Sequence, residues 1–213
     1  MTAAVSSAIE TLYAAFADAP RLMSIHHSPF KTLDTEALPT KPLRKLTDED
    51  LDIYHYRVFH TIVEDSFAYF FPRLIELTHN DMSCLNTELI YQKAALAGWQ
   101  SWPPPRHAAF QSYLDAVIAS FTEEEQVDID DRVCGLGSLL SDLPEHLEIL
   151  RISGTDAAQA NLITLHEDNA GNSFWDKTST AYQSYRAWLH SDTVFERVLE
   201  IYDSKFNCEN IRN

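Results

Sequence analysis

The sequence predicts an all-α protein, either an irregular multi-helix bundle or a short α-solenoid-like array, with about 8–10 helices and no sheet. Apolar residues recur every three or four positions along most of the chain, which is the spacing of one helix face. No segment alternates apolar and polar residues for long enough to form a convincing strand. No clean repeat period is present, so the 213 residues are expected to form a single helical domain, 1–213.

The first helix is predicted over residues 3–17, whose apolar side chains share one face. Residues 20–45 hold four prolines without a sustained period and are interpreted as an irregular connector. Thr47 then supplies an N-cap for a helix whose first turn is acidic. Leu46 and Leu51 occupy the positions of a hydrophobic staple at this helix start.

The next segment, FAYFFPRLIEL at residues 67–77, contains Pro72 in the middle of a helical pattern. A proline inside a helix costs about 3 kcal/mol, whereas one at the first helical position costs little. We therefore predict a break near residues 66–71 and a new helix from Pro72 to about residue 79. A single kinked helix is the alternative.

Arg73 and Glu76 lie three residues apart, so their side chains reach the same helix face. We interpret them as a structural pair that fastens two helices, with Asp48, Asp50 or Asp52 as further partners of Arg73. Catalysis by this pair is the less favoured alternative, because an i,i+3 ion pair is a common helix-stabilising contact.

Seven further helices follow the same spacing. In chain order, they are a helix that ends near Gly98, one after the Trp-Pro-Pro-Pro entry at 102–105, one over 133–143, a short one from Pro144, one from Thr155 to about His166, one over 175–189, and a last one capped by Ser191 or Asp192. Consecutive helices joined by short turns pack against their neighbours in sequence.

The charge is unbalanced, with 16 basic and 32 acidic residues and a net charge of −16. A chain this acidic repels nucleic acid and anionic membranes and favours cationic partners. From Asp115 to Glu148 there are ten carboxylates and a single basic residue, Arg132. The run EEEQVDIDDR in this region lacks the glycine and the last glutamate of an EF-hand loop. We therefore predict a partner-binding patch made of Glu123, Glu124, Glu125, Asp128, Asp130 and Asp131, with Trp99 and Trp102 as aromatic anchors.

The protein is expected in the cytoplasm. Its three cysteines are widely spaced and form no metal-binding motif, which indicates a reducing compartment. The N-terminus has no basic residue before Arg21 and is a poor signal peptide, and no apolar run is long enough to span a membrane. No metal, cofactor or catalytic residue is predicted, because HExxH and GxSxG motifs are absent and His55 and His60 lie on different sides of a helix.

The run LRKLTDEDLDIYHYRVFHT, followed by FFPRLIEL, resembles an uncharacterised bacterial all-helical family. The matching positions are Leu46, Asp50, Leu51, Tyr54, Phe71, Pro72, Arg73, Glu76 and Leu77. The closing AWLHSDTVFERVLEIY is similar to the family's Trp-Leu and Leu-Glu pattern, whereas TIVED at residues 61–65 departs from its Thr-Trp-Gly-like turn. The resemblance covers about a third of the chain. It implies a helical fold without known catalytic residues, and it is compatible with small proteins that neutralise secreted toxins.

Together these observations predict a cytoplasmic, non-enzymatic protein-binding protein. Its most concrete form is an immunity-type inhibitor whose acidic patch covers the basic surface of a toxin, for example a nuclease. Two alternatives stay open. One is an enzyme whose site inside the bundle uses Tyr54, His55, His60 and Glu64. The other is a helical scaffold or adaptor with several partners.

Overall fold

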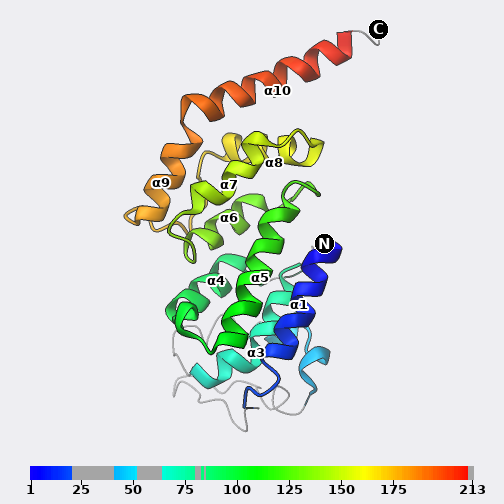
Figure 1. The fold of residues 1–213 in the computed structure, drawn as a ribbon, viewed down its shortest axis with the longest axis vertical. Coiled ribbons are helices and arrows are strands. Elements are labelled where there is room, and N and C mark those ends of the chain that lie inside the picture. The colour runs from blue at the N-terminus through cyan, green and yellow to red at the C-terminus, as the bar shows by residue number, and fades with distance from the viewer. Residues whose placement is uncertain (21–40, 52–63, 80–82, 84, 211–213) are drawn as a thin grey trace. The chain divides into compact units, whose positions relative to one another are not determined.

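The computed structural model describes residues 1–20, 41–51, 64–79, 83 and 85–210, with side chains except at 64–66 and 205–210. Every element among these residues is a helix (Figure 1), which confirms the all-α prediction. Most of the predicted connector at 20–45 lies outside the described residues, and so does the part of the predicted helix that follows Leu51, with Tyr54, His55 and His60. No helix in the described part of the chain is long and apolar enough to cross a membrane.

The chain divides into two compact units within one helix, α5 (Pro104–Ser120). Unit 1 covers Ala3–Leu114 and unit 2 covers Asp115–Asn213. The predicted single domain therefore contains two units, each of which buries apolar side chains of its own.

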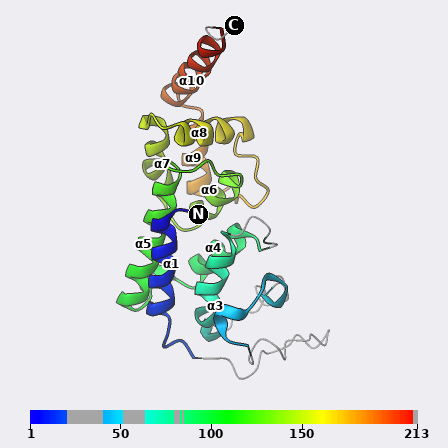
Figure 2. The same ribbon diagram turned by 90° about the vertical axis from the view of Figure 1, so that its right-hand side faces the viewer.

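Unit 1 is built around aromatic side chains. Besides the first turns of α5, it contains α1 (Ala3–Ala15), η1 (Leu43–Lys45), α3 (Glu64–Leu77), α4 (Thr87–Leu96) and η2 (Trp99–Ser101). α3 packs against α1, η1 and α4, and α1 and α5 run side by side in both views (Figure 1 and Figure 2). The ring centroid of Phe71 lies 5.0–5.3 Å from those of Phe16, Phe67, Trp102 and Phe110. These ring contacts hold α3 to α5 and to the end of α1.

The predicted helix break before Pro72 is wrong, because α3 continues through this proline. Proline lacks the N–H that would bond the carbonyl group one turn earlier, at a cost of about 3 kcal/mol. Burial offsets this cost, since each large apolar side chain contributes about 1.5–3 kcal/mol when it leaves water. Four such side chains on one continuous face of α3 are at most 2% exposed: Phe67, Phe70, Phe71 and Leu74.

Trp99 is part of the core of unit 1, so the prediction of a surface anchor at this position is wrong. It is 4% exposed, and its ring stacks on His107 and meets Phe110 edge to face. Gly98 has a φ of 63°, a left-handed conformation that glycine adopts without strain. The chain therefore turns sharply after α4. Trp102 is half-buried among the same aromatic rings.

Unit 2 is a set of helices (Figure 1) that pack mainly against helices other than their immediate neighbours in the chain. After the last turn of α5 come α6 (Ile129–Gly137), α7 (Leu143–Ile152), α8 (Asp156–Asp168), α9 (Thr180–Leu189) and α10 (Asp192–Asn210). α8 contacts α6, α7 and α10, and α9 contacts the same three helices. Thr155 caps α8 as the sequence predicts, by accepting a hydrogen bond from the N–H of Ala158.

Two predicted helix limits in unit 2 are wrong. α6 ends at Gly137, so Leu139 and Leu140 lie in a turn rather than in a helix over 133–143. α9 begins after Trp175, because the hydroxyl of Ser179 caps it at that later point. In both cases the apolar spacing runs past the helix end, since side chains in turns also enter the core.

Candidate functional site

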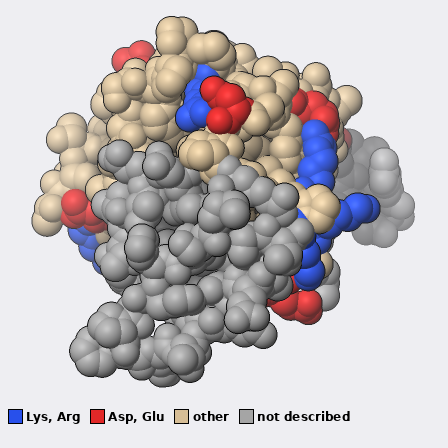
Figure 3. Space-filling model, turned by 90° about the horizontal axis from the view of Figure 1, so that it is seen from below, with Lys and Arg blue, Asp and Glu red and all other residues tan. Residues whose placement is uncertain are grey.

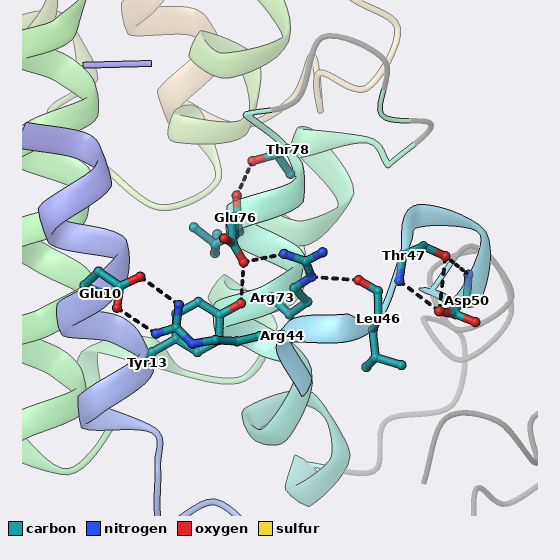
Figure 4. Close-up of polar contacts among 10 residues, drawn as sticks. Glu10, Tyr13, Arg44, Leu46, Thr47, Asp50, Arg73, Glu76 and Thr78 are labelled. Carbon is teal, nitrogen blue, oxygen red and sulfur yellow. Dashed lines mark hydrogen bonds and ion pairs between the residues drawn. The ribbon is translucent and has the colours of Figure 1, made fainter. Parts of the chain in front are cut away.

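Arg73 and Glu76 belong to a polar network that joins helices of unit 1 (Figure 4). Nη1 of Arg73 lies 2.5 Å from Oε2 of Glu76, and its Nε donates to the backbone oxygen of Leu46 at 2.8 Å. The hydroxyl of Tyr13 on α1 donates to the same Glu76 oxygen at 2.5 Å. Burial, together with this carboxylate, raises the pKa of Tyr13, so the phenol remains a donor at neutral pH.

Arg44 of η1 extends this network to Glu10 of α1 (Figure 4). Its guanidinium makes two hydrogen bonds of 2.7 Å with Glu10 and lies 3.7 Å above the ring of Tyr13. A groove of about 560 Å³ runs beside these side chains, with Tyr69 and Pro72 also in its lining. Its charged lining residues, Glu10 and Arg44, are paired with each other. The network therefore ties α1, η1 and α3 together through hydrogen bonds and paired charges.

Arg73 takes the Leu46 carbonyl as its second partner instead of the predicted aspartate. Asp50 accepts a hydrogen bond of 2.6 Å from Lys41 and exchanges hydrogen bonds with Thr47, as in a capping box. Asp52 lies outside the described residues. On the face of unit 1 drawn in Figure 3, basic and acidic side chains likewise lie beside one another. With 13 acidic and nine basic residues up to position 114, this part of the chain is close to neutral.

The net charge lies mainly in unit 2, where 19 acidic residues stand against seven basic ones from Asp115 onward. Three of these cations already have a partner inside the unit: Arg132 pairs with Asp128, Arg151 with Glu148, and Arg197 with Glu200. Acidic side chains thus outnumber the cations that could neutralise them, and unit 2 carries a strong negative field.

Much of the predicted patch lies on the turn between α5 and α6. Glu123 and Glu125 are exposed there, and Glu124 and Asp128 are half-buried. Val127 is 98% exposed in the same turn. We call residues 121–128 the acidic turn. It thus combines several carboxylates with one exposed apolar side chain.

A buried asparagine on α8 holds the acidic turn in place. Asn161 is 0% exposed, and its Nδ2 donates to the carbonyl groups of Phe121 at 2.8 Å and Glu124 at 2.9 Å. Its Oδ1 accepts a hydrogen bond of 2.8 Å from the N–H of Gln126. Three backbone groups of the turn are thus tied to one side chain, so the carboxylates project from a fixed backbone.

The remaining patch residues, Asp130 and Asp131, lie in the first turn of α6 and form a carboxylate cluster with Asp168, the last residue of α8. Asn172 donates a hydrogen bond of 2.8 Å to Asp131. Burial, followed by the charges of Asp168 and Asp131, raises the pKa of Asp130 to about 6, although hydrogen bonds from Asn172 act in the opposite direction. Asp130 therefore carries a proton part of the time near pH 6.

Tyr185 of α9 is fully buried. Burial, followed by the charges of Asp130 and Asp168, raises its pKa well above the ordinary value. Its ring stacks on that of Trp175 at a centroid distance of 5.2 Å. Trp175 lies so close to Gly137 that a Cβ there would overlap the indole ring. Because Gly137 has no side chain, the indole ring of Trp175 packs directly against α6, and the ring of Tyr185 stacks on that indole.

Charge density in the sequence identifies Asp130 and Asp131, but it does not reveal Asp168, Asn172 or Tyr185. The chain reverses directly after α8, where Asn169 and Ala170 both have positive φ, of 54° and 55°. No spacing rule shows that this reversal lies beside the start of α6. Among the described residues, no three His, Cys, Asp or Glu side chains are placed to hold a metal ion. The alternative site with His55, His60 and Glu64 falls outside the described side chains.

We expect Asp130→Asn to raise the free energy of unfolding at pH 7.5 by about 1–2 kcal/mol. The folded state raises the pKa of Asp130 to about 6, above the value of about 3.9 in an unfolded chain. The stability that this group contributes is therefore complete below about pH 4 and is lost as the pH rises through about 6. A neutral amide does not undergo this loss. Urea unfolding at pH 4.5 and pH 7.5 measures the effect.

The matched control is Asp203→Asn, an exposed residue on α10, for which we expect a change within about 0.5 kcal/mol at both pH values. Equal effects of the two substitutions at pH 7.5, or a destabilised Asp130→Asn protein, would contradict the assignment of Asp130 to a mutually repelling cluster.

Comparisons with known proteins leave the site to be interpreted from its own chemistry. No family model, curated protein or solved structure matches the chain. The resemblance to an uncharacterised helical family therefore stays a prediction; it is carried by Leu46, Asp50, Leu51, Tyr54, Phe71, Pro72, Arg73, Glu76 and Leu77. The most uneven chemical feature is the excess of carboxylates in unit 2, which includes the acidic turn and the carboxylate cluster.

Proposed function

We propose that the protein is a non-enzymatic, cytoplasmic binding protein that receives a basic protein partner on unit 2. The observation that carries the proposal is the acidic turn, which presents exposed carboxylates from a backbone fixed by Asn161. A rigid surface of one sign binds an oppositely charged partner quickly, and loses little conformational entropy on binding. The most concrete form of this function is an immunity-type inhibitor that covers the basic surface of a toxin, such as a nuclease.

The composition of the surface supports this proposal. From Asp115 onward, the acidic residues exceed the basic ones by 12, which is three quarters of the net charge of the chain. Trp99 is buried in unit 1, so the apolar contact within the surface comes instead from Val127, at 98% exposure. Partners with lysine and arginine around a small apolar centre fit this arrangement.

The test compares capture and direct binding by wild type and a charge-reversed variant. Wild-type protein is used to capture partners from host lysate at low and high salt. Each basic protein that high salt releases is then purified and titrated by calorimetry. We expect Glu123→Lys with Glu125→Lys to weaken binding at low salt by about tenfold or more, and the difference to shrink at high salt.

The control is Glu196→Lys with Asp203→Lys, which makes the same change of charge on exposed residues of α10. We expect this control to keep most of the affinity. Equal weakening by both double variants would mean that net charge alone, and not the acidic turn, governs binding. Full affinity of the Glu123/Glu125 variant would contradict the proposal.

A further inference from the structure

The groove on unit 1 has the size and the openness of a binding site. Its volume is about 560 Å³, and its lining comes from α1 and the residues after it, from η1 and from α3. Ligand-binding clefts are typically of this size. Phe16 and Pro72 in the lining are buried, whereas Ala14 and Ala17 are exposed. The groove therefore has a closed apolar floor and is open to solvent along the side of α1.

Flat rings line much of this groove. They are those of Tyr13, Phe16, Tyr69 and Pro72. The planar guanidinium of Arg44 lies 3.7 Å above the ring of Tyr13 and extends the same surface (Figure 4). Aromatic-lined grooves bind proline-rich segments in several kinds of recognition domain, because proline rings pack well on flat apolar faces.

The groove also offers hydrogen-bond donors that are not yet used. Two N–H groups of Arg44 donate to Glu10, each at 2.7 Å. A guanidinium has more donors than these, and the other N–H groups make no hydrogen bond with the residues that the structure describes. The hydroxyl of the half-buried Tyr69 is likewise without a partner in the described part of the chain. A ligand rich in acceptors would satisfy these donors.

Charge complementarity selects an uncharged ligand. Glu10 and Arg44 are the charged residues of the lining, and their ion pair leaves the groove close to neutral. A carboxylate or an ammonium group on the ligand would be attracted by one of them and repelled by the other. A neutral carbonyl group, in contrast, accepts a charge-assisted hydrogen bond from the guanidinium. Proline supplies such a carbonyl group and has no N–H group that would itself need a partner.

We propose that this groove binds a proline-rich segment of a partner protein in the polyproline II conformation. The proline rings pack on Tyr13 and Tyr69, and carbonyl groups of the segment accept hydrogen bonds from Arg44 and from the hydroxyl of Tyr69. Polyproline II has no internal hydrogen bonds, so its carbonyl groups are available to a partner. The segment is also stiff before it binds, so it loses little conformational entropy. This contact is separate from the acidic turn, because every residue that lines the groove belongs to unit 1.

The first test titrates a decaproline peptide with blocked ends into the full-length protein by calorimetry. A Gly-Ser repeat peptide of the same length and with the same ends is the control, since it is flexible and has no rings. We expect decaproline to bind at least about tenfold more tightly than the control peptide. The affinity should change by less than about twofold between low and high salt, because the peptide carries no charge.

The second test fills the groove. Ala14→Leu places a larger side chain in it from an exposed position on α1, and we expect the affinity for decaproline to fall about tenfold. The matched control is Ala4→Leu, which is exposed on the same helix but lies outside the lining, and which should change the affinity by less than about twofold. Both variants should keep the melting temperature of wild type within a few degrees, since alanine and leucine are both strong helix formers.

The third test removes one donor. Tyr69→Phe deletes only the hydroxyl, and we expect it to weaken decaproline binding about fivefold, the effect of one hydrogen bond. The melting temperature of the free protein should stay unchanged, because this hydroxyl has no partner among the described residues. Wild-type affinity of this variant would contradict the assigned donor, whether or not the Ala14 variant folds.

Three further outcomes would overturn the inference. The first is equally tight binding of decaproline and the Gly-Ser peptide, and the second is an equal effect of Ala14→Leu and Ala4→Leu. In the third, decaproline does not bind and the wild-type protein is a dimer that Ala14→Leu dissociates, so that the groove receives a second copy of the chain. The proposed function is tested separately, because Glu123→Lys with Glu125→Lys should leave decaproline affinity unchanged.

Discussion

Substitution of Asn161 by leucine is expected to lower the free energy of unfolding by about 3 kcal/mol. Leucine has a similar volume but cannot replace the three hydrogen bonds that Asn161 makes to Phe121, Glu124 and Gln126. Each buried backbone group left unpaired costs about 1–3 kcal/mol, and the acidic turn regains part of this from water as it loosens. For a chain of this length, 3 kcal/mol corresponds to a drop in melting temperature of about 6–12 °C. Urea unfolding and calorimetry measure the two quantities.

The matched control for this substitution is Gln159→Leu, on the same helix. The side chain of Gln159 reaches an exposed backbone oxygen at Gly154, so its loss should cost less than about 1 kcal/mol. We also expect Asn161→Leu to weaken binding of a basic partner, because the carboxylates of the acidic turn no longer project from one conformation. A loss of stability below 1 kcal/mol would show that the turn holds its shape without the asparagine.

Local patterns in the sequence predicted most of the fold. The 3-4 spacing of apolar residues located the helices, because packing of an amphipathic face contributes most of a helix's stability in a protein. The cap at Thr155 was also predicted, because the capping hydroxyl and the N–H group that donates to it lie only three residues apart in the sequence. The uneven charge also pointed to unit 2, because net charge adds up residue by residue.

Features that depend on contacts between distant residues were missed. The helix through Pro72 exists because an apolar face packs on other helices, and a local proline rule does not include that packing. Trp99 was expected at the surface because tryptophan is common at interfaces. The left-handed turn at Gly98 instead directs the side chain of Trp99 into the core. The charge of Asp168 acts on Asp130, and Asn161 donates a hydrogen bond to the carbonyl group of Phe121. Each of these partners lies far earlier in the chain. No spacing rule relates such positions, so the candidate site was only half predicted.

The largest effect on stability is expected from Phe71→Ala in unit 1. Phe71 is 0% exposed and its ring contacts four other aromatic rings, those of Phe16, Phe67, Trp102 and Phe110. Truncation removes the transfer free energy of the ring and leaves a cavity that the surrounding helices cannot fully close, at a cost of about 4 kcal/mol. Urea unfolding with a far-UV circular dichroism readout measures this loss.

The control for this last substitution is Tyr69→Ala, two residues earlier on α3. Tyr69 is half-buried and its ring packs edge to face on Phe70, so we expect a loss of about 1 kcal/mol. Phe71→Leu refines the comparison, because leucine fills part of the cavity and should recover about half of the stability. If alanine at position 71 costs no more than alanine at position 69, the aromatic cluster does not hold α3 in place. The continuity of α3 through Pro72 would then need another source of stability, since that cluster is what offsets the proline.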